Sequence, residues 1–180
     1  GHLYEIGDAG VPFTIQSISK AFVFSLALEI FGPDRVATVI GVEPSGDAFN
    51  SIRLSADNRP FNPIVNSGAI ACSGLIHEAH GEKAFEYVRH MLGRFAGREL
   101  DVDESVFNSE RLTGDRNRAI SFLLRNYGII KGDVAEVLDV YFRQCSVLVT
   151  ARDLALMAAT LANGGINPAT GERVVSPYTV

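Results

Sequence analysis

A polar start, a long apolar run and a strong stop signal make residues 17–31 the segment that most constrains the fold. Ser17 and Lys20 open the segment, and the residues that follow are almost all apolar: Ala21-Phe22-Val23-Phe24-Ser25-Leu26-Ala27-Leu28. Gly32-Pro33 comes next, and this pair is unfavourable inside a helix. We therefore predict one helix over residues 17–31, with its apolar side chains buried.

Most of the remaining chain also shows helical patterns. Asp133-x-x-Glu136 and Thr150-x-x-Asp153 resemble capping boxes, and Asn163-Gly164-Gly165 closes the last of the clear helices. Residues 34–42 fit either a short helix or a strand. The other helices are predicted over residues 66–76, 82–95, 103–112, 117–127, 134–147 and 151–162, and Ser176-Pro177 is predicted to begin one more.

Residues 1–15, by contrast, have the pattern of an extended segment. Leu3, Ile6, Val11 and Phe13 are separated by turn-forming residues, which is typical of a strand followed by a turn. A strand needs partners for its backbone groups, and the rest of the chain offers almost none. We therefore predict an α+β fold in which residues 1–180 are the mainly helical part, plus one or two strands, of a single incomplete domain.

A polar segment too rich in proline for regular structure separates the first long helix from the next one: Asn58-Arg59-Pro60-Phe61-Asn62-Pro63. Compact domains seldom carry so long a loop without a function. We predict that residues 47–65 form a functional loop that leads to Asn66.

Charge and cysteine content restrict the partners and the setting. A net charge of −5, with acidic and basic residues interspersed, argues against binding to nucleic acid or to an anionic membrane. No apolar run reaches the roughly 18 residues of a membrane-spanning helix. Cys72 and Cys145 lie in apolar contexts and are interpreted as reduced, which favours a cytoplasmic setting. The expected partner is a small molecule or another protein.

Ser17 and Lys20 are three residues apart, so they would share one face of a helix. A serine hydroxyl becomes a nucleophile when a base takes its proton, and burial can lower the pKa of a lysine enough for that task. The alternative is a helix-capping serine beside a solvated lysine. A Ser-x-x-Lys pattern occurs by chance about once in a chain of this length, so it needs support from other residues.

Four further polar residues could face a cleft, although each also has an ordinary structural interpretation. Asn66 and Asn117 lie near predicted helix starts, where an amide could cap the helix. Glu110 could be a solvated acid, and Tyr141 could be a core aromatic residue with its hydroxyl at the edge.

His77 and His80 invite a metal interpretation, but their spacing is not that of a zinc-binding helix and no third ligand cluster is obvious. We expect them to be surface residues, and we expect neither a metal nor a cofactor. The glycine-rich phosphate and dinucleotide motifs are missing from the sequence, as is the Gly-x-Ser-x-Gly of α/β-hydrolases.

Five stretches together resemble the serine-dependent glutaminase family, in order and in spacing, over nearly all of the 180 residues. They are Val11-Pro12-Phe13-Thr14-Ile15-Gln16-Ser17-Ile18-Ser19-Lys20, Glu43-Pro44-Ser45-Gly46, Pro60-Phe61-Asn62-Pro63-Ile64-Val65-Asn66-Ser67-Gly68-Ala69-Ile70, Ser109-Glu110-Arg111 with Asn117-Arg118-Ala119, and Tyr141-Phe142-Arg143-Gln144-Cys145-Ser146. This combination is far more specific than Ser-x-x-Lys alone.

The resemblance implies a β-lactamase-like or DD-peptidase-like fold and hydrolysis of L-glutamine to L-glutamate and ammonia. It also implies that Ser17 is the nucleophile, that Lys20 is its activating partner and that Gln16 lines the same pocket. The residues implied to hold the substrate are Ser17, Asn66, Glu110, Asn117 and Tyr141. Family members are commonly oligomeric, which implies a homo-oligomer. Two tyrosine-bearing segments and a late Lys-x-Gly-like strand expected of the family lie outside the chain.

Two alternatives stay open at this point. A penicillin-recognising serine hydrolase of the same fold would act on β-lactams or cell-wall peptides. A non-catalytic binding or oligomerisation module would bind glutamine or a protein without releasing ammonia. For a hydrolase, the Ser17 backbone N–H at a helix start is expected to stabilise the developing oxyanion.

Overall fold

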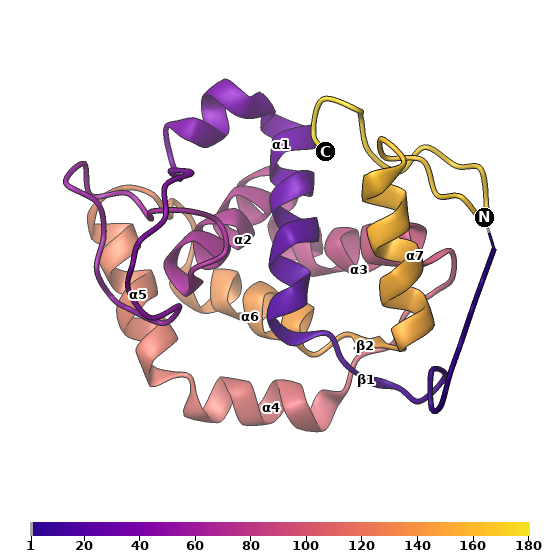
Figure 1. Ribbon diagram of the computed structural model, residues 1–180. Coiled ribbons are helices and arrows are strands. Elements are labelled where there is room, and N and C mark those ends of the chain that lie inside the picture. Colours follow the sequence, from indigo (N-terminus) through magenta and orange to yellow (C-terminus); the bar gives the residue numbers. More distant parts are fainter. Residues whose placement is uncertain (1) are drawn as a thin grey trace.

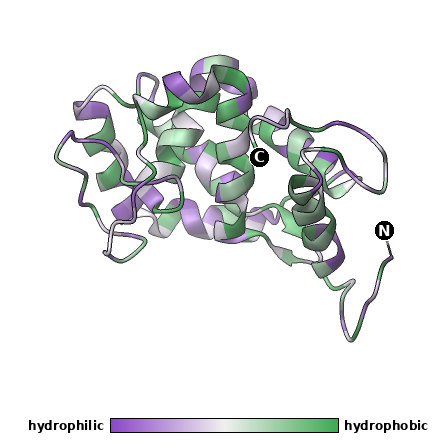
Figure 2. Ribbon diagram, turned by 45° about the horizontal axis from the view of Figure 1, so that its top comes forward, coloured by the Kyte–Doolittle hydropathy of each residue, from purple (hydrophilic) through white to green (hydrophobic). Residues whose placement is uncertain are grey.

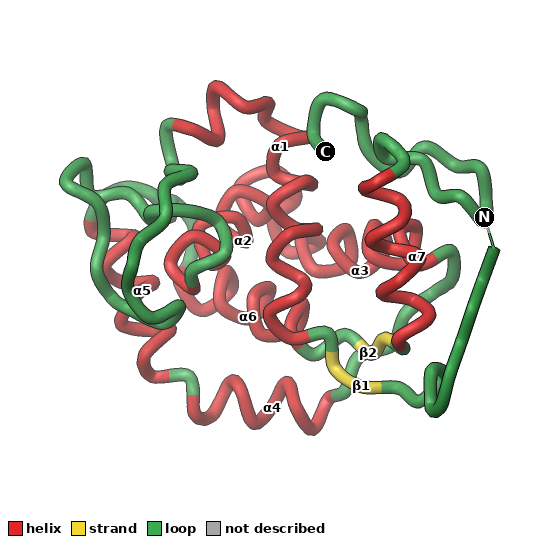
Figure 3. The backbone as a smooth tube through the Cα atoms, viewed as in Figure 1, coloured by secondary structure: helices red, strands yellow, loops and turns green. Residues whose placement is uncertain are grey.

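The computed structural model describes residues 2–180, and helices account for most of the regular structure (Figure 1). The elements in chain order are β1 (Phe13–Thr14), the 3-10 helix η1 (Gln16–Ile18), α1 (Ser19–Ala37), α2 (Asn66–His80), the 3-10 helix η2 (Gly81–Lys83), α3 (Ala84–Ala96), α4 (Glu104–Thr113), α5 (Asp115–Asn126), α6 (Val134–Cys145), β2 (Leu148–Val149) and α7 (Ala151–Ala162). The predicted α+β class is confirmed, with two short strands beside the helices (Figure 3).

Helix α2 lies at the centre of the molecule. It packs against α1, α3, α5 and α6, and nearly all of its residues from Asn66 to Ile76 are buried. Small side chains on this helix let its neighbours approach closely. At Gly68 the approach is closest, because an added Cβ would lie 1.9 Å from the backbone oxygen of Asn62. The long loop before α2 is therefore seated directly on the first turn of the helix.

Helix α1 does not end at Gly32-Pro33, as the sequence suggested. It continues to Ala37 through a kink at Gly32, where φ is 73° and ψ is 162°. Glycine reaches this left-handed backbone at little cost, and Pro33 then occupies the first turn of a second helical piece, where a missing N–H does no harm. The segment 34–42 is accordingly helical as far as Ala37 and not a strand.

The two strands form a minimal antiparallel pair in which Phe13 faces Val149 and Thr14 faces Leu148. Strand β2 was not predicted from the sequence, because the preceding helix was expected to continue to residue 147, whereas α6 ends at Cys145. Residues 2–12 have no regular structure, so the predicted strand is confined to Phe13–Thr14. In Figure 2 this amino-terminal segment runs outside the helical body, and its apolar side chains Leu3, Tyr4 and Ile6 are exposed.

The other helix predictions hold with shifted ends. The capping box of Thr150 and Asp153 begins α7, which has the predicted bounds. Helix α2 continues to His80, four residues beyond its predicted end, and the following helix begins at Ala84. Ser176-Pro177 begins a turn, not a helix. No helix within residues 2–180 combines the length and apolar character that crossing a membrane would require.

Candidate active site

Ser17 lies in η1, the short turn that connects β1 to α1. Its side chain is exposed, whereas the backbone on either side is anchored: Ile15 is buried and its N–H donates to Val147 O at 2.8 Å. The preceding residue, Gln16, has a φ of 48° although it is not a glycine. Such a left-handed residue costs about 1–3 kcal/mol and persists only where surrounding contacts enforce it. Backbone strain is thus located directly before the candidate nucleophile.

Lys20 lies one turn further along, and it is not solvated. It is only 2% exposed, and its Nζ donates to Asn66 Oδ1 at 2.7 Å and to Ile64 O at 2.8 Å. The ring of Phe49 lies 5.6 Å from Nζ. Burial lowers the pKa of Lys20 below its usual value, because a desolvated ammonium is disfavoured. The alternative of a solvated surface lysine is therefore wrong, and the long loop supplies part of the burial.

The hydroxyl of Ser17 and the amine of Lys20 are not directly hydrogen-bonded within residues 2–180. The amine is held by two acceptors, Asn66 Oδ1 on α2 and Ile64 O in the loop before it. Ser17, by contrast, belongs to the 3-10 helix η1 before α1. Catalytic hydrogen bonds are often long before substrate binds. The sequence spacing placed both groups at one helix start, but it did not reveal the competing acceptors.

Asn66 connects the lysine to a third helix. It is the first residue of α2, and its side chain is hydrogen-bonded to Lys20 and Asn117 and not to the backbone of the helix start, so the capping interpretation is wrong. Its Oδ1 accepts from Lys20, while its Nδ2 donates to Asn117 Oδ1 at 3.1 Å. Asn117 lies in the first turns of α5. The structure therefore brings together three of the predicted site residues from α1, α2 and α5.

Tyr141 approaches from α6 and is only 4% exposed. Burial strongly raises the pKa of its hydroxyl, and neighbouring Cys145 and the charge of Glu110 act in the same direction. Glu110 belongs to α4, in the last turn before the Gly114 break. Tyr141 is consequently a protonated hydroxyl at neutral pH, with the Glu110 carboxylate nearby.

Cys145, from the same helix as Tyr141, is a buried free thiol. Burial raises its pKa to about 12, and the Glu110 carboxylate adds to this effect, while Lys20 opposes it. The prediction of an unpaired, buried cysteine is confirmed for both Cys72 and Cys145. Charged groups from α4 and α1 thus act in opposite directions on the pKa of one buried thiol on α6.

A buried polar chain beneath η1 was not recognised from the sequence. Ser19, Ser73 and Gln144 are all fully buried, and they are linked by hydrogen bonds across α1, α2 and α6. The only sequence signal was a glutamine near the end of α6, at a position that the helical period places on the otherwise apolar, buried face of that helix.

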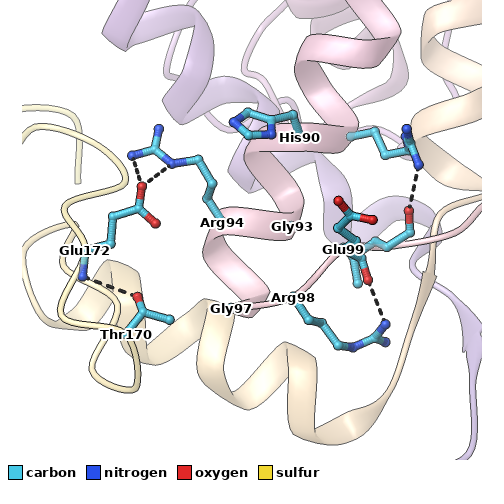
Figure 4. A pocket seen from close by; sticks show the side chains of 10 residues that line it. His90, Gly93, Arg94, Gly97, Arg98, Glu99, Thr170 and Glu172 are labelled. Carbon is cyan, nitrogen blue, oxygen red and sulfur yellow. Dashed lines mark hydrogen bonds and ion pairs between the residues drawn. The ribbon is translucent and has the colours of Figure 1, made fainter.

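Figure 4 shows a pocket elsewhere, over α3 and the residues that follow it. Three arginines line it, but each is engaged by the protein: Arg94 pairs with Glu172, Arg98 with Asp153, and Arg89 donates to Leu100 O. None of the predicted site residues lines this pocket. Its arginine side chains bind other parts of the protein: Arg94 contacts residues 172–173, and Arg98 contacts the first turn of α7.

The two histidines that invite a metal interpretation are half-buried and engaged by neighbouring side chains, so their assignment to the surface is wrong. His77 Nε2 lies 3.0 Å from Glu136 Oε2, and His80 stacks on Tyr87 with ring centroids 4.0 Å apart. Within residues 2–180 there is no cluster of three side chains that could hold a metal ion.

Comparison with known proteins gives consistent matches. The Glutaminase family model matches residues 1–180. "Glutaminase 2" of Bradyrhizobium diazoefficiens is 69% identical over 180 residues, which are the whole of this chain and 29% of that protein. The "Glutaminase" of Microcystis aeruginosa is 50% identical over 181 residues, covering 54% of its length. A crystal structure of a Bacillus glutaminase superposes with a TM-score of 0.90 at 35% identity, covering 96% of this chain and 59% of that one.

These matches settle the fold and the family together. The structural neighbours are glutaminases, so the β-lactamase-like fold expected from the resemblance is confirmed. The chain spans about a third to a half of the length of the relatives named here. Both the family model and the sequence identity extend over the entire chain, and on that basis the chain belongs to the Glutaminase family.

Proposed function

We propose that the protein containing this chain hydrolyses L-glutamine to L-glutamate and ammonia, with Ser17 as nucleophile and Lys20 as its base. The observation that carries the proposal is the burial of Lys20 one turn from the exposed hydroxyl of Ser17. A buried lysine with a lowered pKa can accept a proton near neutral pH, which a solvated lysine does poorly.

In the proposed reaction, Ser17 Oγ attacks the side-chain carboxamide carbon of glutamine as its proton passes to the amine of Lys20. The tetrahedral intermediate expels ammonia after the nitrogen receives that proton, leaving a glutamyl ester on Ser17. Water then attacks the ester, and glutamate and the free hydroxyl are regenerated. The Ser17 N–H, at the start of the helical segment, is the proposed oxyanion donor.

The remaining residues divide the binding of the amino acid. Glu110 is the proposed partner of the substrate ammonium, because its negative charge raises the pKa values of both Tyr141 and Cys145. Asn66, Asn117 and Tyr141 offer uncharged hydrogen-bonding groups for the carboxylate and carboxamide. Burying a second carboxylate without a matched cation, as binding of glutamate would require, would cost several kcal/mol.

The test is ammonia release by the full-length protein from L-glutamine, with L-asparagine as a matched shorter substrate. We expect turnover of L-glutamine and little turnover of L-asparagine, because the shorter side chain cannot bring its carboxamide to Ser17 while its ammonium contacts Glu110. Binding of L-glutamine without ammonia release would contradict the proposal and favour a binding module. Stable labelling of Ser17 by a β-lactam, without glutamine turnover, would favour a penicillin-recognising hydrolase.

We also propose that the protein is cytoplasmic and homo-oligomeric. The two buried free cysteines, Cys72 and Cys145, support a reducing setting. Oligomerisation rests on the family membership. Fractionation of cells and sedimentation of the full-length protein test these two statements separately.

A further inference from the structure

The buried side chains of Ser73, Gln144 and Ser19 form a continuous hydrogen-bonded chain that ends on the backbone next to Ser17. Ser73 Oγ lies 3.1 Å from Gln144 Oε1, and Gln144 Nε2 donates to Ser19 Oγ at 3.3 Å. Ser19 Oγ in turn donates to Gln16 O at 2.7 Å. Each link has one donor and one acceptor, so the direction of the whole chain is defined from α2 through α6 to α1.

The hydrogen-bonded side chains end at the peptide unit between Gln16 and Ser17, which carries the proposed oxyanion donor. Gln16 O and the N–H of Ser17 belong to the same planar, trans peptide group, so they point in opposite directions. Ser19 holds Gln16 O twice, through its Oγ and through its backbone N–H. Because the carbonyl is drawn toward the buried side, the Ser17 N–H is turned away from it, toward the side where Ser17 is exposed.

The same peptide unit directly follows a strained residue. Gln16 adopts a φ of 48°, which a residue with a side chain takes only when other contacts enforce it. Within residues 2–180, the Ser17 N–H has no protein acceptor, which leaves it free to serve a substrate oxygen. A relaxed Gln16 would rotate this peptide unit and re-aim the N–H.

We infer that Gln144, acting through Ser19, is a positioning residue that aims the Ser17 backbone N–H at the developing oxyanion. This inference rests on the proposed function of Ser17. Gln144 itself is fully buried, and within residues 2–180 its side-chain hydrogen bonds go to Ser73 and Ser19, not to Ser17 or Lys20. Its effect on the reaction is therefore indirect, through the orientation of one peptide group.

The experiment compares variants of the full-length protein in which different hydrogen bonds of the Ser73–Gln144–Ser19 chain are removed. Gln144→Met keeps the volume and removes both hydrogen bonds, and Ser19→Ala removes the last link. Ser25→Ala is the matched control, because Ser25 lies on the same helix, is buried and donates only to its own helix at Ala21 O. Ser19→Thr restores a hydroxyl at the critical position and serves as the rescue variant.

We expect Gln144→Met and Ser19→Ala each to lower kcat for L-glutamine about 10- to 100-fold, with KM within about twofold of the parent, since misplacement of one oxyanion donor affects the transition state. The kcat of the double variant should lie within about twofold of the kcat of the slower single variant, because both changes interrupt the same series of hydrogen bonds. Ser25→Ala should leave kcat unchanged, and Ser19→Thr should recover at least half of the activity lost on the logarithmic scale.

A structural readout separates this inference from the proposed function. Crystal structures of Ser19→Ala and Gln144→Met should show the Gln16 φ relaxed to a negative value. A Gln16 φ that stays positive in both variants, or a kcat unchanged in both, would overturn the inference while leaving the function intact. If the parent protein releases no ammonia, the proposed function is overturned, and the Gln16 backbone in the same variants still decides the positioning role. Should Ser19→Ala fail to fold, Gln144→Met and Ser73→Ala provide the same test.

Discussion

Lys20 Nζ donates to Asn66 Oδ1 at 2.7 Å, and this contact joins the first turn of α1 to the first residue of α2. A second donation goes to Ile64 O at 2.8 Å. A neutral amine has two N–H groups and one lone pair, so two fixed acceptors leave the lone pair for a proton from a neighbouring hydroxyl. The surroundings of Lys20 thus suit an amine that works as a base.

Replacing Asn66 by aspartate tests this arrangement through the pH dependence. Asn66→Asp places a carboxylate at the same 2.7 Å position, and an adjacent negative charge raises the pKa of a lysine. Because the reaction needs the neutral amine, the rising limb of kcat/KM should move to higher pH by roughly one unit or more. Asn163→Asp, on the exposed end of α7, is the charge-matched control and should not move it. A limb that stays in place or moves to lower pH in Asn66→Asp contradicts the role given to Lys20.

The close contact at Gly68 predicts a second effect, on stability and activity together. Gly68→Ala would bring a Cβ within 1.9 Å of Asn62 O, which cannot move without displacing the loop that carries Ile64. We expect a loss of about 1–3 kcal/mol in the free energy of unfolding, together with a lower kcat.

Gly74→Ala provides the matched comparison on the same helix. Its added Cβ would be 3.4 Å from Ile130 Cγ1, an ordinary contact, and helix propensity favours alanine by about 0.5–1 kcal/mol. Denaturant unfolding of both variants checks the pair. Equal stability of the two variants would show that the loop is not held where the structure puts it.

Glu110 is expected to act mainly on substrate binding. Glu110→Gln removes the charge proposed to meet the substrate ammonium, and a charged hydrogen bond contributes about 1.5–3 kcal/mol. We expect kcat/KM for L-glutamine to fall roughly 10- to 100-fold, chiefly through a higher KM. Glu104→Gln on the same helix should leave KM unchanged, since its partner Arg143 forms only an exposed pair at 3.0 Å. An unchanged KM in Glu110→Gln would remove Glu110 from the site.

Asp153 is expected to make the free energy of unfolding depend on pH in the acid range. Its burial favours the protonated form, but hydrogen bonds from Arg98 and Thr150 outweigh burial and hold its pKa below the usual 3.8. A lowered pKa in the folded state means that the stabilisation is complete above pH 3.8 and is lost as the pH falls through the lower folded value.

Asp153→Asn should therefore cost about 1–2 kcal/mol at neutral pH, with half-exposed Arg98 limiting the loss. The difference between parent and variant should shrink as the pH falls below 3.8. Urea unfolding at neutral pH and at low pH measures both values. A difference that grows on acidification would contradict the assignment.

The sequence predicted most helices of the fold, but it missed the features that depend on contacts between distant segments. Helix α7 was found because its capping box lies within four consecutive residues. Strand β2 was missed because its partner is more than a hundred residues away in the sequence. The kink at Gly32 was taken for an end, since local rules forbid a straight helix there but do not say whether another turn follows.

The same distinction applies to the site. Ser17 and Lys20 were recognised from their spacing, and the family resemblance supplied Asn66, Glu110, Asn117 and Tyr141. The hydrogen bonds that organise them could not be read from spacing, because Lys20 meets Asn66 and Ile64 across more than forty residues. Gln144 was quoted only as part of a family stretch and was given no role, since its hydrogen bonds join it to Ser73 and Ser19, which are far away in the sequence.

Ammonia release from L-glutamine by full-length protein carrying Ser17→Ala tests the central claim most directly, with Ser25→Ala, in the adjoining helix α1, as the control. The account predicts that kcat falls by roughly 1,000-fold or more in Ser17→Ala, while the folded fraction and the activity of Ser25→Ala match the parent. Ammonia release at the parent rate by Ser17→Ala would contradict it.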